Sequence, residues 1–87
     1  MAWDIAWTRE ALKDRERIEK SPYCDKAKSL IAILKENPYK KPPSYERLIG
    51  DFKGAFSRRI NIQHRLVYQV LEQEHTVKIL SMWGYYE

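Results

Sequence analysis

Four residues in the middle of the chain carry charges that suit chemistry at a phosphate. Arg58, Arg59 and Arg65 fall within eight residues, and Glu46 is one of two acids between residues 37 and 68. Arginine stays charged and binds two oxygens at once, so a cluster of arginines suits a phosphate group. A carboxylate among cations stays ionised and can accept a proton from a hydroxyl. These residue types favour phosphate binding with a general base beside it.

Each of these residues also has an ordinary structural interpretation. The arginines could be solvated strand residues opposite a core face, and Glu46 could form an ion pair with Arg47 or Arg59. The charge distribution favours a polyanion, because residues 37–68 hold seven lysines and arginines in a chain of formal net charge +4. That partner is either nucleic acid or an acidic protein segment.

The arginines lie in a pattern that predicts a β-hairpin. Side chains alternate between the two faces of a strand, so Ser57 and Arg59 share one face, and Phe56 and Arg58 share the other. The remaining pattern predicts a strand over 3–7 and a helix over 9–20 that Thr8 caps. A second helix is capped by Ser21 and ends at Asn37, and a loop over 37–44 follows. Three strands are predicted over 55–62, 65–71 and 76–83.

This order predicts a single α+β domain over residues 1–87, with two helices packed on one face of an antiparallel sheet. The other face of the sheet would stay open for Arg59, Arg65 and the end of the last strand. No stretch approaches the ~20 apolar residues of a membrane span, and the N-terminus has no signal-peptide pattern. Cys24 is the single cysteine, which fits a cytoplasmic protein.

Other kinds of site are not indicated. The two histidines, His64 and His75, fall in predicted turns without a cluster of carboxylates or cysteines, so we expect no metal and no cofactor. The C-terminal run of aromatic residues from Trp83 to Tyr86 suits stacking on unpaired RNA bases. Core packing or a homodimer interface would use the same rings.

Two motifs point to a known family. The run Ser57-Arg58-Arg59-Ile60, followed by His64-Arg65-Leu66-Val67-Tyr68, resembles the YoeB/Txe toxins of the RelE superfamily. These proteins are the toxins of bacterial type II toxin–antitoxin pairs. The resemblance extends over the whole chain in length and element order, and it implies the RelE-like fold. It also implies an endoribonuclease that cleaves messenger RNA in the ribosomal A site without a metal or cofactor.

The resemblance assigns roles to single residues. Glu46 takes the place of the family's general base, and Arg59 and Arg65 match its active-site arginines. The family's general acid is a histidine near the C-terminus, and Tyr85 stands there in this chain. Tyrosine, with a pKa near ~10, is a weaker acid than histidine, near ~6.5. Tyr85 is therefore a working substitute, a crippling change or an engineered attenuation.

The resemblance also implies partners. A YefM-like antitoxin and the RNA of the ribosomal A site, messenger and ribosomal, are expected on the basic surface. Residues assigned to RNA contact rather than chemistry, with solubility or tail packing as the plain alternative, are Lys40, Lys41, Lys53, Arg58 and Tyr86. Two other functions stay open: a catalytically impaired member that only binds ribosome or antitoxin, and a ParE-like gyrase poison, whose family lacks this glutamate and arginine set.

Overall fold

The computed structural model describes residues 2–42, 44–48 and 54–83 of the chain. The helices and strands of these residues are β1 (Asp4–Trp7), α1 (Arg9–Glu19), α2 (Cys24–Glu36), β2 (Glu46–Arg47), β3 (Ala55–Arg59), β4 (Arg65–Leu71) and β5 (Thr76–Ser81). The predicted α+β fold, with two helices packed on a sheet, is confirmed.

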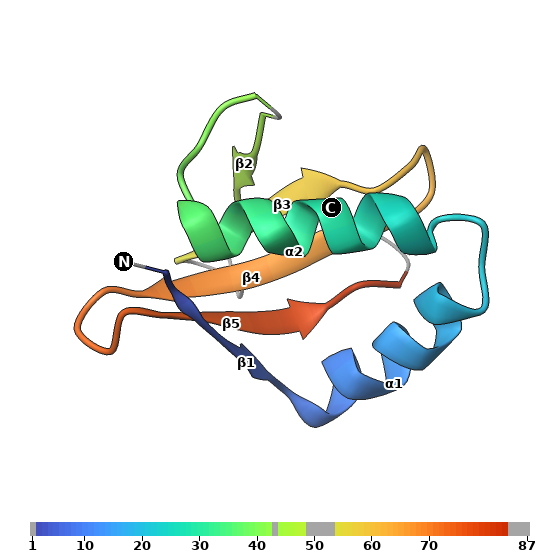
Figure 1. Cartoon of the computed structure of the whole chain (residues 1–87), viewed down its shortest axis with the longest axis horizontal. Coiled ribbons are helices and arrows are strands. Elements are labelled where there is room, and N and C mark those ends of the chain that lie inside the picture. Colours follow the sequence, from blue (N-terminus) through green and yellow to red (C-terminus); the bar gives the residue numbers. More distant parts are fainter. Residues whose placement is uncertain (1, 43, 49–53, 84–87) are drawn as a thin grey trace.

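The strands form one five-stranded sheet in the order β1-β5-β4-β3-β2 (Figure 1). Strands β3, β4 and β5 pair antiparallel in chain order, as predicted, and β2 pairs antiparallel with β3. Strand β1 differs, because it pairs parallel with β5. A parallel pair needs a long connection, which both helices and the intervening strands supply. The sheet is therefore mixed, with its first and last strands side by side.

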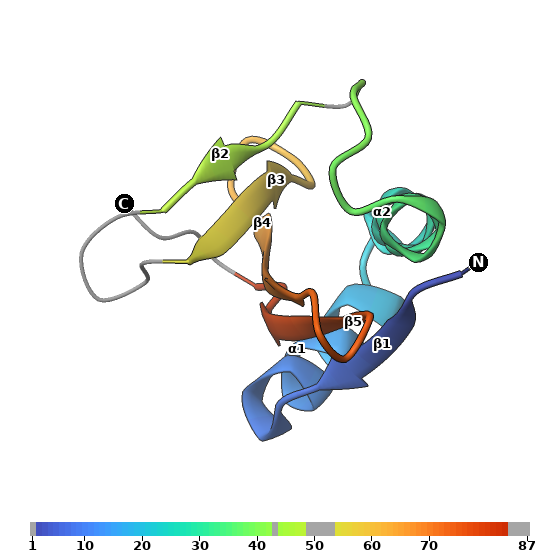
Figure 2. The ribbon, with the colours of Figure 1, turned by 90° about the vertical axis from the view of Figure 1, so that its left-hand side faces the viewer.

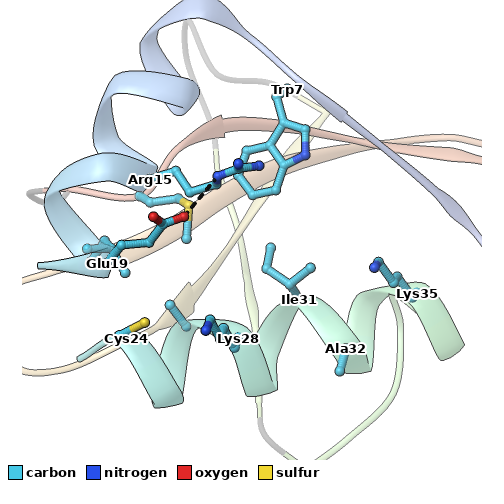
Figure 3. Close-up of a pocket in the computed structure, with 11 residues that line it drawn as sticks. Trp7, Arg15, Glu19, Cys24, Lys28, Ile31, Ala32 and Lys35 are labelled. Atoms are coloured by element: carbon cyan, nitrogen blue, oxygen red, sulfur yellow. Dashed lines mark ion pairs between the residues drawn. The ribbon is translucent and has the colours of Figure 1, made fainter. Parts of the chain in front are cut away.

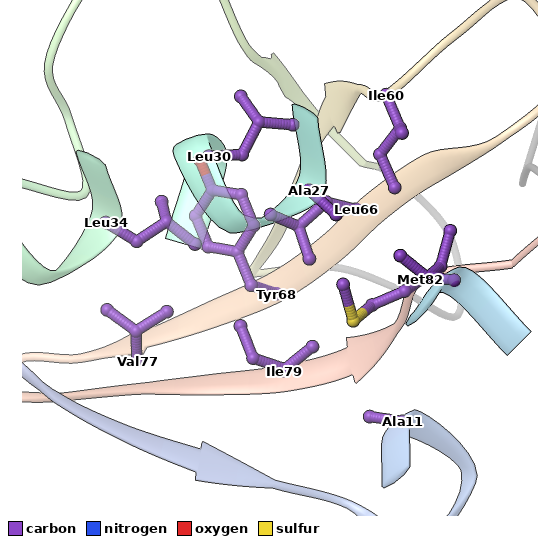
Figure 4. Close-up of a cluster of buried hydrophobic side chains, with 11 residues drawn as sticks. Ala11, Ala27, Leu30, Leu34, Ile60, Leu66, Tyr68, Val77, Ile79 and Met82 are labelled. Atoms are coloured by element: carbon purple, nitrogen blue, oxygen red, sulfur yellow. The ribbon is translucent and has the colours of Figure 1, made fainter. Parts of the chain in front are cut away.

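Both helices cover the same face of the sheet (Figure 2). They bury apolar residues at helical spacing, such as Ala27, Leu30 and Leu34 of α2. The buried apolar cluster between helices and sheet (Figure 4) consists of Ala11, Ile18, Ala27, Leu30, Leu34, Ile60, Leu66, Tyr68, Val77, Ile79 and Met82. The opposite face of the sheet bears neither helix, and its exposed residues include Glu46 and Arg59, whereas Ser57, Val67 and Ser81 on the same face are buried.

Polar side chains set the ends of α1. The hydroxyl of Thr8 accepts a hydrogen bond from the Ala11 N–H at 3.1 Å, so the predicted N-cap is confirmed. Ser21 does not cap α2, which begins at Cys24. Its hydroxyl instead donates to the Ile18 carbonyl at 2.7 Å. The prediction for Ser21 is wrong because α2 begins three residues later, so the Ser21 hydroxyl accepts from the Tyr23 N–H at 3.2 Å, ahead of the first helical turn.

Over the described residues, neither helix combines the length and the apolar character needed to cross a bilayer.

Candidate active site

Glu46 lies in β2, a two-residue strand that the sequence pattern did not predict. It pairs with Ser57 of β3, and the next residue, Arg47, pairs with Phe56. The Leu48 N–H extends this ladder by donating to the Ala55 carbonyl at 2.9 Å. Directly paired residues point to the same face of a sheet, so Glu46 lies on the face of Ser57, opposite the helices.

Arg59 and Arg65 lie directly opposite each other at adjoining ends of β3 and β4. Arg59 follows Ser57 by two residues, so both arginines share the face of Glu46. Opposed residues have Cβ atoms about 4.5–5.5 Å apart, and Glu46 is a diagonal neighbour of Arg59 at about 7–8 Å. The fold therefore brings the predicted base and the predicted arginines onto one patch of the open face.

The charged side chains of this patch form no ion pair with one another or with the other described residues. Two ion pairs occur in the described part of the chain, Arg15–Glu19 at 3.3 Å and Lys40–Glu36 at 3.1 Å. Neither includes Glu46, Arg59 or Arg65, so the alternative of an ion pair with Glu46 is not observed there. Two like charges placed opposite each other are destabilising unless an anion binds between them. The arginine pair is thus suited to a phosphate.

Two buried hydroxyls extend the patch across the sheet. The register places Glu46, Ser57, Val67 and Ser81 in one row over β2, β3, β4 and β5. Ser57 and Ser81 are 2% and 1% exposed, and neither Oγ has a hydrogen-bond partner among the described residues. Most buried polar atoms have such a partner. Sequence reasoning missed these serines because a serine in a strand gives no signal of its own.

Arg58 is buried, which contradicts its assignment to RNA contact. It is 0% exposed and shares the helix-covered face with Tyr68. Its Nε donates to the Tyr68 hydroxyl at 3.0 Å, and its Nη2 donates to the carbonyls of Pro38 and Lys40, each at 2.9 Å. Strand alternation explains the position, and these partners explain how a charge is tolerated in the core.

Two tyrosines beside this network are held in the protonated form. Burial raises the pKa of Tyr68, although the Arg58 guanidinium acts in the opposite direction. Burial and a hydrogen bond donated to the Glu72 carboxylate raise the pKa of Tyr39 to about 12. Both hydroxyls therefore remain donors at neutral pH.

The lysines expected to contact RNA lie in the segment that leads to β2. Lys40 and Lys41 are exposed, and the Lys41 ammonium lies 5.0 Å from the centre of the Tyr45 ring. Their position agrees with an outward-facing basic loop, but their role stays a prediction. The other predicted site residues lie outside the described residues: Lys53, Tyr85 and Tyr86.

The last described residues are anchored by Asp14, which sequence reasoning did not single out, and by His64. The Asp14 carboxylate, 6% exposed, accepts a hydrogen bond from the Met82 N–H at 3.1 Å. The Trp83 ring stacks on His64 with centroids 4.0 Å apart. His64 belongs to the turn between β3 and β4, so Trp83 lies near the strand ends that carry Arg59 and Arg65. His64 therefore has a structural role, as the stacking partner of the Trp83 ring.

A groove between α1 and α2 is distinct from this patch (Figure 3). It has a volume of about 340 Å³, and its apolar lining includes Trp7, Ile31 and Met82. The Arg15–Glu19 ion pair lies at its edge. The groove lies on the helix side of the sheet and the charged patch on the other. Within residues 2–42, 44–48 and 54–83, no group of His, Cys, Asp and Glu could hold a metal ion.

Comparison with known proteins adds a family to this geometry. A family model described as a YoeB-like toxin of bacterial type II toxin–antitoxin systems matches residues 7–86. Toxin YoeB of Streptomyces coelicolor is 33% identical over 70 residues, which cover 80% of this chain and 73% of the relative.

Solved structures agree with this match. A YoeB/ParE toxin from Agrobacterium tumefaciens is 28% identical with a TM-score of 0.86, covering 95% of this chain and 99% of the other. A YoeB–YefM complex from Staphylococcus aureus gives 27% identity and a TM-score of 0.81, with 99% and 100% covered. The YoeB dimer of that organism matches over the same shares at 27% identity, with a TM-score of 0.82.

Proposed function

Because the chain belongs to the YoeB-like toxins of bacterial type II toxin–antitoxin systems, we propose that it is a ribosome-dependent endoribonuclease. Its substrate is messenger RNA in the ribosomal A site, and cleavage there stops translation. The observation that carries this proposal is the patch on the open sheet face. It combines one exposed carboxylate with two opposed arginines, none of which forms an ion pair with another described residue.

The proposed reaction is an attack by a ribose 2′-hydroxyl on the adjacent phosphorus. Glu46 removes the hydroxyl proton, and the oxygen forms the new bond to phosphorus as the bond to the 5′-oxygen breaks. Arg59 and Arg65 stabilise the negative charge that builds on the phosphoryl oxygens. Tyr85 donates a proton to the departing 5′-oxygen. The products are a 2′,3′-cyclic phosphate and a 5′-hydroxyl, and the chemistry needs neither a metal nor a cofactor.

The spacing of the patch suits this reaction. A diagonal separation of about 7–8 Å between Glu46 and Arg59 leaves room for a ribose and its phosphate between the two side chains. An exposed carboxylate is reachable by a hydroxyl of a large substrate, and it keeps its charge near the arginines. Because the nucleophile is the 2′-hydroxyl, DNA is not a substrate.

Substitution of Glu46 tests the proposal. Glu46→Gln keeps the size of the side chain but removes its basicity, so single-turnover cleavage on programmed ribosomes should fall by about 10²- to 10⁴-fold. That loss corresponds to about 2.7–5.5 kcal/mol in the activation free energy. Glu10→Gln, in the exposed first turn of α1, makes the same chemical change elsewhere and should leave the rate unchanged.

A Glu46→Gln protein that cleaves at the wild-type rate would remove the carboxylate from the mechanism. Messenger RNA with a 2′-deoxy nucleotide at the cleavage position gives an independent measurement. It should bind normally and resist cleavage, whereas cleavage of this substrate would exclude attack by the 2′-hydroxyl.

A YefM-like antitoxin is the proposed protein partner, since a YoeB of similar fold forms a complex with YefM in Staphylococcus aureus. An acidic segment of the antitoxin would cover Arg59 and Arg65 and so block phosphate binding. The dimeric YoeB of the same organism makes a homodimer of this chain a second assembly to test. Ribosomes and antitoxin both place the proposed activity in the cytoplasm.

A further inference from the structure

The buried arginine of β3 connects to one particular segment of the chain. Arg58 donates to the carbonyls of Pro38 and Lys40, each at 2.9 Å, and its guanidinium lies 5.0 Å from the centre of the Tyr45 ring. These three partners all belong to residues 38–45, the stretch between α2 and β2. The fourth partner, Tyr68, donates in turn to the Pro38 carbonyl at 3.4 Å. The interactions of Arg58 therefore tie this segment to the centre of the sheet.

The segment needs such an anchor because few backbone groups of its described residues form local hydrogen bonds. Its described residues form neither helix nor strand, and local hydrogen bonds from the Tyr39 and Lys40 N–H groups to Asn37 occur only at its start. Strand β2, which follows directly, is two residues long and exposed. A strand this short contributes little pairing energy, so its position depends on the chain on either side of it.

The residue that follows the anchored segment is Glu46. Tyr45 packs against Phe56 with ring centroids 5.4 Å apart, on the same side of the sheet as Arg58. Strand alternation turns the next side chain, that of Glu46, to the opposite face. A guanidinium that holds Pro38, Lys40 and Tyr45 on one face therefore determines where the carboxylate of Glu46 emerges on the other.

We propose that Arg58 is a positioning residue, whose buried guanidinium fixes residues 38–45 and thereby holds Glu46 in place opposite Ser57. This inference rests on the proposed function, because it assigns Glu46 the role of general base. Arg58 itself does not touch substrate. Apolar residues of similar volume often stabilise a core as well as a buried charge does, so an arginine here is better explained by the segment it organises.

Substitution by lysine separates charge from geometry. Arg58→Lys keeps the positive charge, but a single ammonium cannot reproduce the fork that joins Tyr68, Pro38 and Lys40. Amide hydrogen exchange should therefore become at least tenfold faster at residues 45–48, with exchange in β4 and β5 unchanged. Arg17→Lys, on the exposed face of α1, is the matched control and should leave both regions as in the wild type.

Kinetics provides the second measurement. A displaced general base should lower the single-turnover rate about 10- to 100-fold, since small misplacements of catalytic groups have effects of this size. The affinity for ribosomes should stay within twofold, because Arg58 is not on the surface. In a protein that already carries Glu46→Gln, Arg58→Lys should cause no further loss of rate. This result is expected if Arg58 affects the rate only through Glu46.

A milder variant protects the test against a protein that fails to fold. Tyr68→Phe removes the hydroxyl that accepts from Arg58 and donates to Pro38, and it keeps the ring in the core. This variant should show the same two effects at smaller size: amide exchange at residues 45–48 several-fold faster, and a single-turnover rate several-fold lower. Unchanged exchange at residues 45–48 in both variants would overturn the proposal.

The outcomes for Arg58 and for Glu46 can be told apart. Additive losses of rate from Arg58→Lys and Glu46→Gln would overturn positioning through Glu46, even if the endoribonuclease activity is confirmed. If Glu46→Gln cleaves at the wild-type rate, Glu46 is not the general base of the proposed reaction. The proposal that Arg58 positions a catalytic group is then rejected as well. Faster exchange at residues 45–48 would then still establish Arg58 as the anchor of the segment.

Discussion

Neighbouring arginines of β3 have opposite environments. Arg58 is fully buried and Arg59 is exposed, although both are cations in one run of the chain. Strand alternation separates them, and the difference bears on their proposed roles: Arg59 lies on the face where substrate is proposed to bind, and Arg58 faces the core of the protein. At the scale of single residues, function in this chain is set by the face of the sheet as much as by residue type.

The residue-scale prediction concerns the general acid. Tyr85→His should restore the residue that the family resemblance places there, and primer extension on messenger RNA in a translating extract can compare the two proteins. If tyrosine is a competent acid, both proteins cut in the A site and their pH profiles differ. Cleavage by the histidine form should decline as the pH rises through about 6.5, where histidine loses its proton, whereas tyrosine keeps its proton to about 10.

Cleavage by the histidine form alone would identify this chain as an attenuated toxin that binds without cutting. Cleavage by neither form, with ribosome binding intact, would instead contradict the assignment of a general acid at position 85.

At the scale of elements, the joint between β1, α1 and β5 holds the sheet edge together. Thr8 connects all three elements. Its N–H donates to the Ile79 carbonyl at 3.2 Å. Its hydroxyl donates to the Leu80 carbonyl at 3.2 Å and accepts from the Ala11 N–H. One residue thus ends β1, begins α1 and secures the last strand. Helix α1 in turn carries Asp14, which holds Met82.

Replacement of this cap should weaken the fold without touching the charged patch. Thr8→Ala removes both hydroxyl contacts and should lower the free energy of unfolding by about 1–2 kcal/mol, measured by urea denaturation. Thr8→Ser keeps the hydroxyl and serves as the control, with a loss well below that of alanine. An unchanged midpoint for Thr8→Ala would show that the cap contributes nothing to stability.

The elements also show what sequence patterns can predict. Strand β4 matches its predicted range of 65–71, because alternating apolar residues mark it clearly, and α2 follows from its apolar spacing. Strand β2 was missed, since Glu46 and Arg47 have no strand character and pair only because distant residues hold them there. The burial of Arg58 was missed for the same reason: its partners Pro38 and Lys40 lie 20 and 18 residues away.

The sequence led to Glu46, Arg59 and Arg65, whose roles stay predictions, but it did not indicate the contacts that support their positions. The face shared by Arg59 and Arg65 follows from alternation, and the place of Glu46 came from the family resemblance. Nothing in the sequence indicates that Ser57 and Ser81 would be buried with no partner in the described part of the chain, or that the Asp14 carboxylate would accept from the Met82 N–H. Contacts between residues so far apart depend on tertiary structure, which no local pattern records.

For the whole molecule, the uneven distribution of charge is the feature that favours association with a polyanion. The chain has a formal net charge of +4, and its basic residues concentrate between positions 37 and 68. The exposed Lys40 and Lys41 lie in the segment next to β2, on the edge of the sheet that also carries Glu46. A large polyanion would thus be attracted to the side of the molecule where the reaction is proposed.

Salt dependence measures this attraction. The logarithm of the affinity for ribosomes should fall linearly with the logarithm of salt concentration, and replacing Lys40 and Lys41 with glutamine should reduce the slope by about 1.4 if each contacts one phosphate. Replacing Lys26 and Lys28, two exposed lysines of α2, with glutamine removes the same charge and should leave the slope unchanged. Equal slopes for both double variants would leave Lys40 and Lys41 with a role in solubility alone.

The buried hydroxyls of Ser57 and Ser81, which have no hydrogen-bond partner among the described residues, bear on how long the protein survives. Each buried hydroxyl without a partner lowers stability by about 1–3 kcal/mol. A bound molecule that supplied both hydrogen bonds would restore that stability and shift the population away from unfolded, protease-sensitive chains. Degradation of the toxin would then slow whenever its open face is occupied, so a molecule that silences it would also preserve it.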